Sequence, residues 1–272
     1  MIKLIAFIGL SVALAVAPAF AQEYTGDGND GSPFRLDPVL DGVFLGTAVG
    51  LNGTAFYLDM VTELDRIEFS DTVHDASRVD GFDRVLMYPY SRELEYIGMG
   101  MSIASILMPA VLLATPKDAW IPIGTMYAET MLMAYGLKEL GKVCVNRPRP
   151  YMYFDGYPTD DVDDSDWNNS FPSGHTTLAF AGASFTSYVF GEYFPDSSMR
   201  MPVIASSYAL ALGTAAFRIA GGNHFLTDVI AGAMIGTACG LFVPWFHALS
   251  AESSWNMSIQ VTPMGMLVSF AL

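Results

Sequence analysis

The sequence predicts an all-α protein, a helical bundle with about five apolar core helices embedded in a membrane. Hydrophobic residues make up 52% of its 272 residues and charged residues only 15%, whereas soluble domains average about 25% charged residues. Five stretches with no charged residue, or only one, follow one another between residues 96 and 251, as in successive apolar helices. No internal repeat and no alternation of strand and helix patterns interrupts them.

The first residues have the features of an export signal. Lys3 precedes an apolar run from Leu4 to Ala17, and Ala19-Phe20-Ala21 offers a small-x-small cleavage site before Gln22. We therefore interpret residues 1–21 as a signal peptide or, if it is not cleaved, as an N-terminal membrane anchor. Either alternative exports the segment that follows.

Residues 22–95 form an acidic region that we predict to be exported. The net charge of the whole chain is −15, which excludes a nucleic-acid-binding protein. The stretch from Pro38 to Met60 is moderately apolar but contains Asp41, so we reject it as a membrane span. Residues 61–95 interleave acidic and basic side chains, which predicts amphipathic helices in water.

Residues 96–251 form the predicted helical core. Its apolar stretches are Tyr96–Pro116, Ala119–Leu137, His175–Gly191, Met201–Phe217 and Val229–Ala251. At about 1.5 Å per residue the longest can cross an apolar layer of about 30 Å, whereas the shortest barely can. Glu129, in the middle of the second stretch, favours the alternative of a soluble helical protein, and hydropathy alone leaves both alternatives open.

The tail, residues 252–272, departs from the helical pattern. Ile259 and Val261 alternate with polar residues and Leu267–Leu272 can return as a strand, so we expect a short β-hairpin. The two cysteines, Cys144 and Cys239, define no disulfide framework. We expect both to be buried free thiols.

Two prolines end the helix that begins near Ala119. Pro148 and Pro150 cannot continue the helical backbone, so Lys142 lies on its last turns and Arg149 just beyond. Two cations are thereby directed into one region.

A second cluster lies immediately before the apolar stretch that begins at His175. It reads Pro172-Ser173-Gly174-His175. The free N–H groups of a helix start, with the small Ser173 and Gly174, form a cradle for an anion the size of phosphate.

The third cluster joins the last two apolar stretches. Arg218 is followed by two glycines that allow a sharp turn, and His224 and Asp228 then lie at i and i+4 on one helical face. Each cluster alone has an ordinary structural explanation. Together they bring cations, histidines and an anion cradle to the ends of apolar helices, where an unpaired cation is costly unless it binds an anion.

This three-part pattern resembles the signature of the type-2 phosphatidic acid phosphatases, shared with vanadium haloperoxidases and class A bacterial acid phosphatases. The parts are K-x6-R-P from Lys142, P-S-G-H from Pro172, and R-x5-H-x3-D from Arg218. The resemblance covers roughly residues 95 to 250. One departure is Phe217, where the family often has serine, and it removes no catalytic group.

The resemblance implies a role for each motif residue. His224 would attack phosphorus and form a phosphohistidine, Asp228 would hold its other ring nitrogen, and His175 would act as general acid and then as general base. The phosphate oxygens would be bound by Lys142, Arg149, Ser173, Gly174 and Arg218. Neither a metal nor another cofactor is required.

The implied function is a metal-independent phosphatase in the bacterial cell envelope, with its active site facing the periplasm or exterior. The expected substrate is a phosphate monoester or pyrophosphate of a lipid, such as phosphatidate or an isoprenyl pyrophosphate. A soluble periplasmic acid phosphatase acting on small phosphate esters, a vanadium haloperoxidase and a non-enzymatic membrane scaffold are the alternatives. Membrane lipids are expected neighbours, and the oligomeric state stays open.

The acidic run from Asp155 to Asp166 lies between the first two motifs. We interpret it as a solvated loop. Contact with a cationic head group, calcium binding and control of access to the pocket are the functional alternatives.

Overall fold

A computed structural model describes residues 32–61, 73–159, 166–252, 256–262 and 265–271. The predicted signal peptide and residues 160–165 of the acidic run lie outside these residues. The described part is built on six long helices, with bounds α2 Pro38–Val61, α4 Arg92–Leu107, α5 Trp120–Val145, α7 Gly174–Tyr193, α8 Arg200–Ala220 and α9 Leu226–Glu252. The all-α prediction is confirmed.

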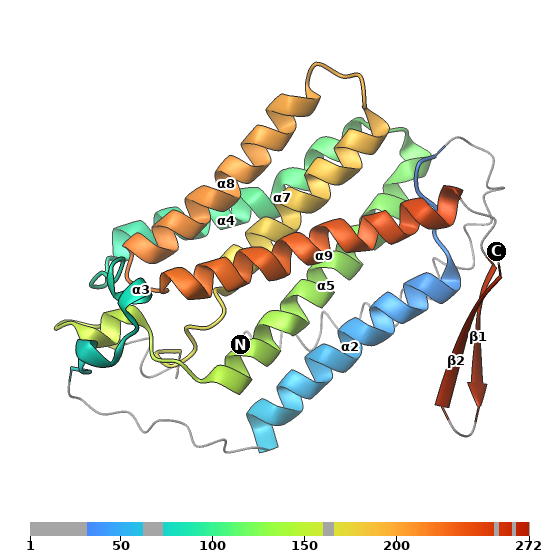
Figure 1. The fold of residues 1–272 in the computed structure, drawn as a ribbon. Helices are drawn as coiled ribbons and strands as arrows, with labels where there is room; N and C mark the ends of the chain where they lie inside the picture. The colour runs from blue at the N-terminus through green and yellow to red at the C-terminus, as the bar shows by residue number, and fades with distance from the viewer. Residues whose placement is uncertain (1–31, 62–72, 160–165, 253–255, 263–264, 272) are drawn as a thin grey trace.

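The long helices lie roughly side by side, as Figure 1 shows. Helix α7 packs against α9, α8, α5 and α4, and α2 packs along α5. Helix α4 continues into the 3₁₀ segment η2, Met108–Ala114, which begins where Pro109 interrupts the α-helical pattern. The five predicted core helices are all present, and α2 is a sixth.

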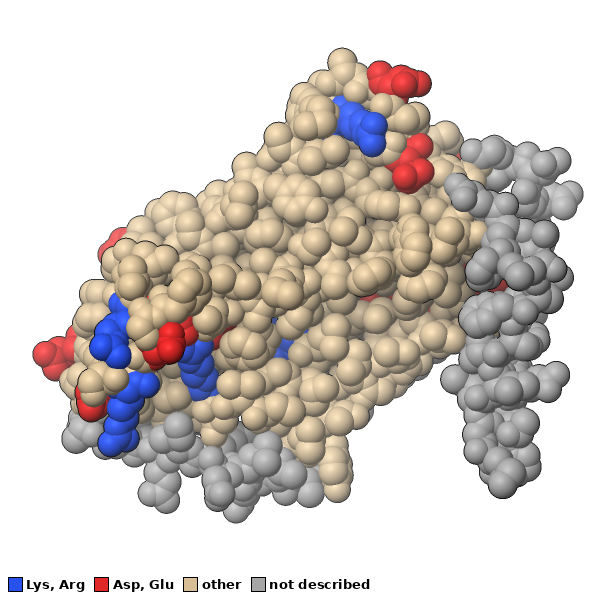
Figure 2. Space-filling model, viewed as in Figure 1, with Lys and Arg blue, Asp and Glu red and all other residues tan. Residues whose placement is uncertain are grey.

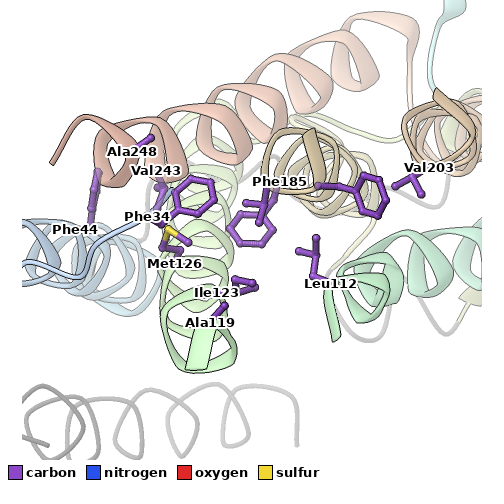
Figure 3. Close-up of a cluster of buried hydrophobic side chains, with 12 residues drawn as sticks. Phe34, Phe44, Leu112, Ala119, Ile123, Met126, Phe185, Val203, Val243 and Ala248 are labelled. Carbon is purple, nitrogen blue, oxygen red and sulfur yellow. The ribbon is translucent and has the colours of Figure 1, made fainter. Parts of the chain in front are cut away.

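The main hydrophobic core lies where α5, α7, α9 and η2 meet. Figure 3 shows Phe185 of α7 among Ile123 and Met126 of α5 and Leu112 of η2, with Val243 of α9 nearby. All five side chains are buried. Their burial fixes the three central helices relative to one another and therefore positions the motifs at the helix ends.

Glycines allow α9 to lie directly on α7. Gly232, Gly236 and Gly240 follow one another at intervals of four residues and share one face of α9. A Cβ at Gly236 would lie 2.1 Å from the carbonyl oxygen of Thr177, much closer than any real contact. The start of α7, which carries the second motif, is thus held against the start of α9, which follows the third.

Among the described residues, four helices are long and apolar enough to cross a membrane, by length and composition. They are Pro38–Met60, Arg92–Ala114, Arg200–Ala220 and Leu226–Ala251. Pro38–Met60, which we rejected as a span because of Asp41, thus meets the same criteria of length and composition as the other three. Large apolar side chains such as Leu107, Leu212 and Met234 are exposed on these helices, as expected for surfaces that face lipid.

The remaining elements are short. Residues 73–91 form the 3₁₀ turn η1, Ala76–Arg78, and the single helical turn α3, Gly81–Arg84, rather than long amphipathic helices. The predicted hairpin is present, with β1, Asn256–Thr262, antiparallel to β2, Gly265–Ala271. Both cysteines are free, but Cys144 is exposed rather than buried, and only Cys239 is buried.

Candidate active site

The three motifs meet at one end of the bundle, where α5 and α8 end and α7 and α9 begin (Figure 1). Most of the Lys and Arg side chains visible in Figure 2 gather at this end. Backbone hydrogen bonds join the motif segments in pairs: Ser170 donates to Arg147 at 3.0 Å, Ser173 to Asp228 at 3.0 Å and Tyr151 to Gly222 at 3.1 Å. The backbone thus holds the three motifs as one unit.

His224 lies in the turn between α8 and α9 and is 2% exposed. Its Nδ1 is 2.7 Å from the carbonyl oxygen of Ser170, and because a carbonyl can only accept, Nδ1 carries the proton. The Nε2 lone pair is then directed toward Arg149, whose Nη1 is 3.4 Å away. Burial and the nearby Arg149 and Arg218 lower the pKa of His224 well below its usual value, so the ring is neutral and nucleophilic.

Asp228 anchors the turn that carries His224. Its carboxylate accepts hydrogen bonds from the Ser170 hydroxyl at 2.5 Å and the Phe225 N–H at 2.8 Å. Its Oδ2 lies 3.8 Å from His224 Nδ1, too far for a hydrogen bond. In this conformation the ring bonds the Ser170 carbonyl, and Asp228 acts on the ring through the hydroxyl of the same serine.

Arg147 and Asp83 are functional candidates that the motif analysis missed. Arg147 donates to Asp228 at 2.6 Å and to Asp83 at 2.7 Å. Asp83, 2% exposed, also accepts from the N–H and hydroxyl of Thr227 at 2.9 and 2.7 Å. A chain of contacts therefore runs from α3 through Arg147 to Asp228. Arg147 stands two residues before a motif arginine, but nothing in the sequence marks Asp83.

Arg149 is 3% exposed and faces the ring of His224. Its Nη1 also donates to the Asn223 carbonyl at 3.2 Å, and its Nη2 pairs with Asp166 at 2.5 Å. Burial alone would raise the pKa of Asp166, but Arg149 and Lys142 lower it to about 2. The last residue of the acidic run is thus an ionised partner of the arginine, although 43% of its side chain stays exposed.

Arg218 closes the opposite side of the site. It lies on the last turn of α8, is 2% exposed and pairs with Glu95 of α4 at 3.2 Å. Among the described residues its Nε is buried without a hydrogen-bond partner. A buried guanidinium N–H with no acceptor is a natural contact for a phosphate oxygen.

The second motif begins α7. Ser173 is buried, its hydroxyl lies 2.9 Å from that of Thr176, and Gly174 is the first residue of the helix. The first N–H groups of a helix have no partner inside it, so those of Gly174 and His175 are available to an anion. His175 itself is half-buried next to this cradle.

Lys142 and a second lysine approach the cradle from α5. Lys142 is half-buried on the last turn. Lys138, one turn earlier, is 6% exposed, forms an ion pair with Glu139 and lies 3.8 Å from the centre of the Tyr135 ring. A Cβ at Gly174 would meet Lys138 Cδ at 3.1 Å, so this lysine reaches the start of α7. Sequence reasoning missed it, although its spacing from Lys142 is one helical turn.

Comparison with known proteins identifies a family whose sequences resemble this part of the chain. Residues 124–251 match the PAP2 superfamily, and the match includes all three motifs. This part of the chain is thus similar to the PAP2 superfamily. The resemblance inferred from the motifs is thereby confirmed.

The individual proteins similar to this chain share 30% or less of its sequence over the matched regions. A lipid A 1-phosphatase of Porphyromonas gingivalis is 30% identical over 132 residues, which are 48% of this chain and 25% of the relative. The chain thus matches about a quarter of that relative's length. The crystal structure of Aquifex aeolicus LpxE has a TM-score of 0.40 at 23% identity, covering 59% of this chain and 90% of that one. A transmembrane PAP2-type phosphatidylglycerolphosphate phosphatase from Bacillus subtilis has a TM-score of 0.39 at 18% identity, covering 74% and 95%.

Proposed function

We propose that this chain is a metal-independent PAP2 phosphatase that hydrolyses a phosphate monoester or pyrophosphate of a lipid through a phosphohistidine at His224. The proposal rests on the protonation and the contacts of that histidine ring. Its Nδ1–H is committed to the Ser170 carbonyl, which leaves the Nε2 lone pair beside the Arg149 guanidinium. A neutral ring with one fixed nitrogen and one free nitrogen is an activated nucleophile.

The first step forms the covalent intermediate. Phosphate oxygens are bound by Arg149, Arg218, Lys142, the Ser173 hydroxyl and the N–H of Gly174. The Nε2 lone pair of His224 attacks phosphorus in line and the P–O bond to the leaving group breaks. His175, whose pKa burial and the nearby cations lower in the empty site, takes up a proton when the phosphate anion offsets those cations, and gives it to the leaving oxygen. Ser170, backed by Asp228, stabilises the positive charge that the phosphorylated ring acquires.

The second step releases phosphate. His175, now neutral, takes a proton from a water molecule that attacks phosphorus from the side the leaving group has vacated. The P–N bond breaks, and its electron pair returns to His224. The fixed cations supply the charge stabilisation that a metal ion would supply elsewhere.

A lipid substrate is supported by the setting of the site. The motifs lie at the ends of helices that include α8 and α9, both long and apolar enough to cross a membrane, and the curated relative is named for a lipid phosphatase. The exposed apolar side chains of α4, α8 and α9 argue against the alternative of a soluble acid phosphatase, because a monomer in water rarely exposes large apolar surfaces.

The decisive experiment compares wild type with His224→Ala in metal-chelated buffer, on phosphatidate and on a small soluble phosphate ester. We expect phosphate release from the lipid by wild type and none by the variant, with a ³²P-labelled, acid-labile protein adduct only in wild type. Preference for the soluble ester would move the assignment to an acid phosphatase. Full activity in the variant would exclude the phosphohistidine.

The membrane side of the site is a separate proposal, the periplasmic or exterior face, and the family resemblance supports it. The argument that Pro38–Met60 does not cross no longer contributes, since α2 is long and apolar enough to do so. Cys144, free and exposed near the end of α5, is a native reporter, while Cys239 is buried. A membrane-impermeant maleimide should label Cys144 in cells whose outer membrane has been permeabilised; labelling only after the inner membrane is broken would place the site in the cytoplasm.

A further inference from the structure

Three ionisable side chains meet at the end of the bundle opposite the motifs. Asp41 lies on the first turn of α2, Glu129 in the middle of α5 and His247 near the end of α9. Glu129 and His247 are each 0% exposed and Asp41 is 9% exposed. The sequence shows only isolated polar residues in apolar helices; the fold brings the three together.

The donor atoms of the cluster converge on one point. One oxygen from each carboxylate and a ring nitrogen of His247 all lie within 4.8 Å of one another. His247 Nε2 is 3.0 Å from Glu129 Oε2 and 3.7 Å from Asp41 Oδ1. Ligands that surround a tetrahedral ion at bonds of about 2.1 Å stand about 3.4 Å apart, so these separations fit around one ion.

The hydrogen bonds of the cluster fix the orientation of the histidine ring. His247 Nδ1 lies 3.0 Å from the carbonyl oxygen of Arg35, so Nδ1 carries a proton. Nε2 lies 3.0 Å from Glu129 Oε2 in a second hydrogen bond, so one of these two atoms holds a proton that a bound cation would displace. Metal-binding histidines have this same arrangement, with the second nitrogen held by a carbonyl. Asp41 Oδ1 and Glu129 Oε1 are buried without a hydrogen-bond partner.

Charge balance points to a divalent ion. With both carboxylates ionised and the imidazole neutral, two negative charges would lie among apolar helices, where an uncompensated charge is costly. No ion pair between either carboxylate and a lysine or arginine occurs among the described residues. A divalent cation neutralises both charges and occupies all three acceptor atoms at once.

We propose that Asp41, Glu129 and His247 bind one divalent transition-metal ion of the Zn²⁺ type, which ties α2 to α5 and α9. One nitrogen and two carboxylate oxygens form a ligand set suited to Zn²⁺, with Glu129 Oε1 or a water as the fourth ligand. His247 follows Asp228 by nineteen residues on α9, about 28 Å at the helical rise. The ion is therefore structural and takes no part in the phosphatase chemistry.

The test measures metal content directly. Full-length protein in detergent is stripped with a chelator, dialysed against Zn²⁺ and assayed by mass spectrometry, beside Asp41→Asn, Glu129→Gln and His247→Gln. We expect one tightly bound Zn²⁺ per wild-type chain and at least tenfold weaker binding in each variant. Stripped wild type loaded with Co²⁺ should show the visible absorption of a low-symmetry N/O site, and the variants should lack it.

Matched controls separate this site from other histidines. His74→Gln makes the same substitution at a ring that packs against Tyr153 and Trp167, and it should keep the full metal content. His224→Gln removes a catalytic ring and should also keep it. If His247→Gln does not fold, the metal content of Asp41→Asn provides the test, because asparagine has nearly the same shape as the aspartate that it replaces on α2. Wild type without stoichiometric metal, or variants that retain it, would show that the cluster holds protons instead.

Discussion

At the scale of single residues, the contacts of Asp83 and Arg147 indicate that His224 is positioned by a chain of partners. Asp83 holds Arg147, Arg147 holds Asp228, and Asp228 holds the hydroxyl of Ser170, whose carbonyl fixes the ring. Neither Asp83 nor Arg147 bonds the ring directly, so both act as positioning residues.

Asp83→Asn should therefore lower kcat while leaving KM nearly unchanged. Loss of a comparable outer partner at a metal-bound histidine costs about 10- to 100-fold, and we expect about tenfold here. Asp75→Asn is the matched control, because Asp75 is an exposed helix-capping aspartate of the same segment. An equal loss in the control, or a rise in KM alone, would contradict the positioning role.

Lys138 offers a second prediction at this scale. It is a buried cation that reaches the first residue of α7, so it adds positive charge beside the phosphate cradle. Lys138→Met keeps the length of the side chain and removes the charge, and should reduce kcat/KM about tenfold or more, consistent with loss of a charge-assisted contact of about 1.5–3 kcal/mol. Lys117→Met, three residues before the start of α5 and far from the cradle, should have no effect on kcat/KM.

The lowered pKa of His224 has a consequence for stability. The folded protein keeps this ring neutral, whereas the unfolded chain takes up a proton near the usual pKa of about 6.5. Stability should therefore be lost as pH falls below that value and should be independent of this group above it. His224→Gln should show a smaller drop in Tm between pH 7.5 and pH 5 than wild type; an equal drop would mean that the ring is protonated in the folded protein.

At the scale of elements, the close contact between α7 and α9 limits which substitutions the two helices tolerate. A Cβ at Gly236 would overlap the backbone of α7, whereas one at Gly124 on α5 would meet nothing within 4 Å. Gly236→Ala should destabilise the protein by about 1–3 kcal/mol, while Gly124→Ala should stabilise it by up to about 1 kcal/mol through helix propensity. Thermal unfolding in detergent measures both, and equal effects would show that α9 does not approach α7 so closely.

The elements also show which features a sequence reveals. The helix ends at Pro148 and at Ser173-Gly174 were predictable, since proline and glycine act on the local backbone and the motif residues stand at those ends. Asp83 and Lys138 were not, because their importance depends on partners far away in the chain. The rejection of Pro38–Met60 as a span judged Asp41 alone, although in the fold it lies beside His247.

At the scale of the whole molecule, the two polar clusters lie at opposite ends of one apolar bundle and should respond differently to a chelator. Removal of metal should leave hydrolysis of phosphatidate unchanged within about twofold, because fixed cations replace a metal at the phosphate. It should lower the Tm of wild type, since an ion that binds only the folded state stabilises it, and it should not change the Tm of Asp41→Asn. Activity lost together with metal would place the ion in catalysis. An unchanged Tm would mean that α2 is held to α5 and α9 by packing and hydrogen bonds alone.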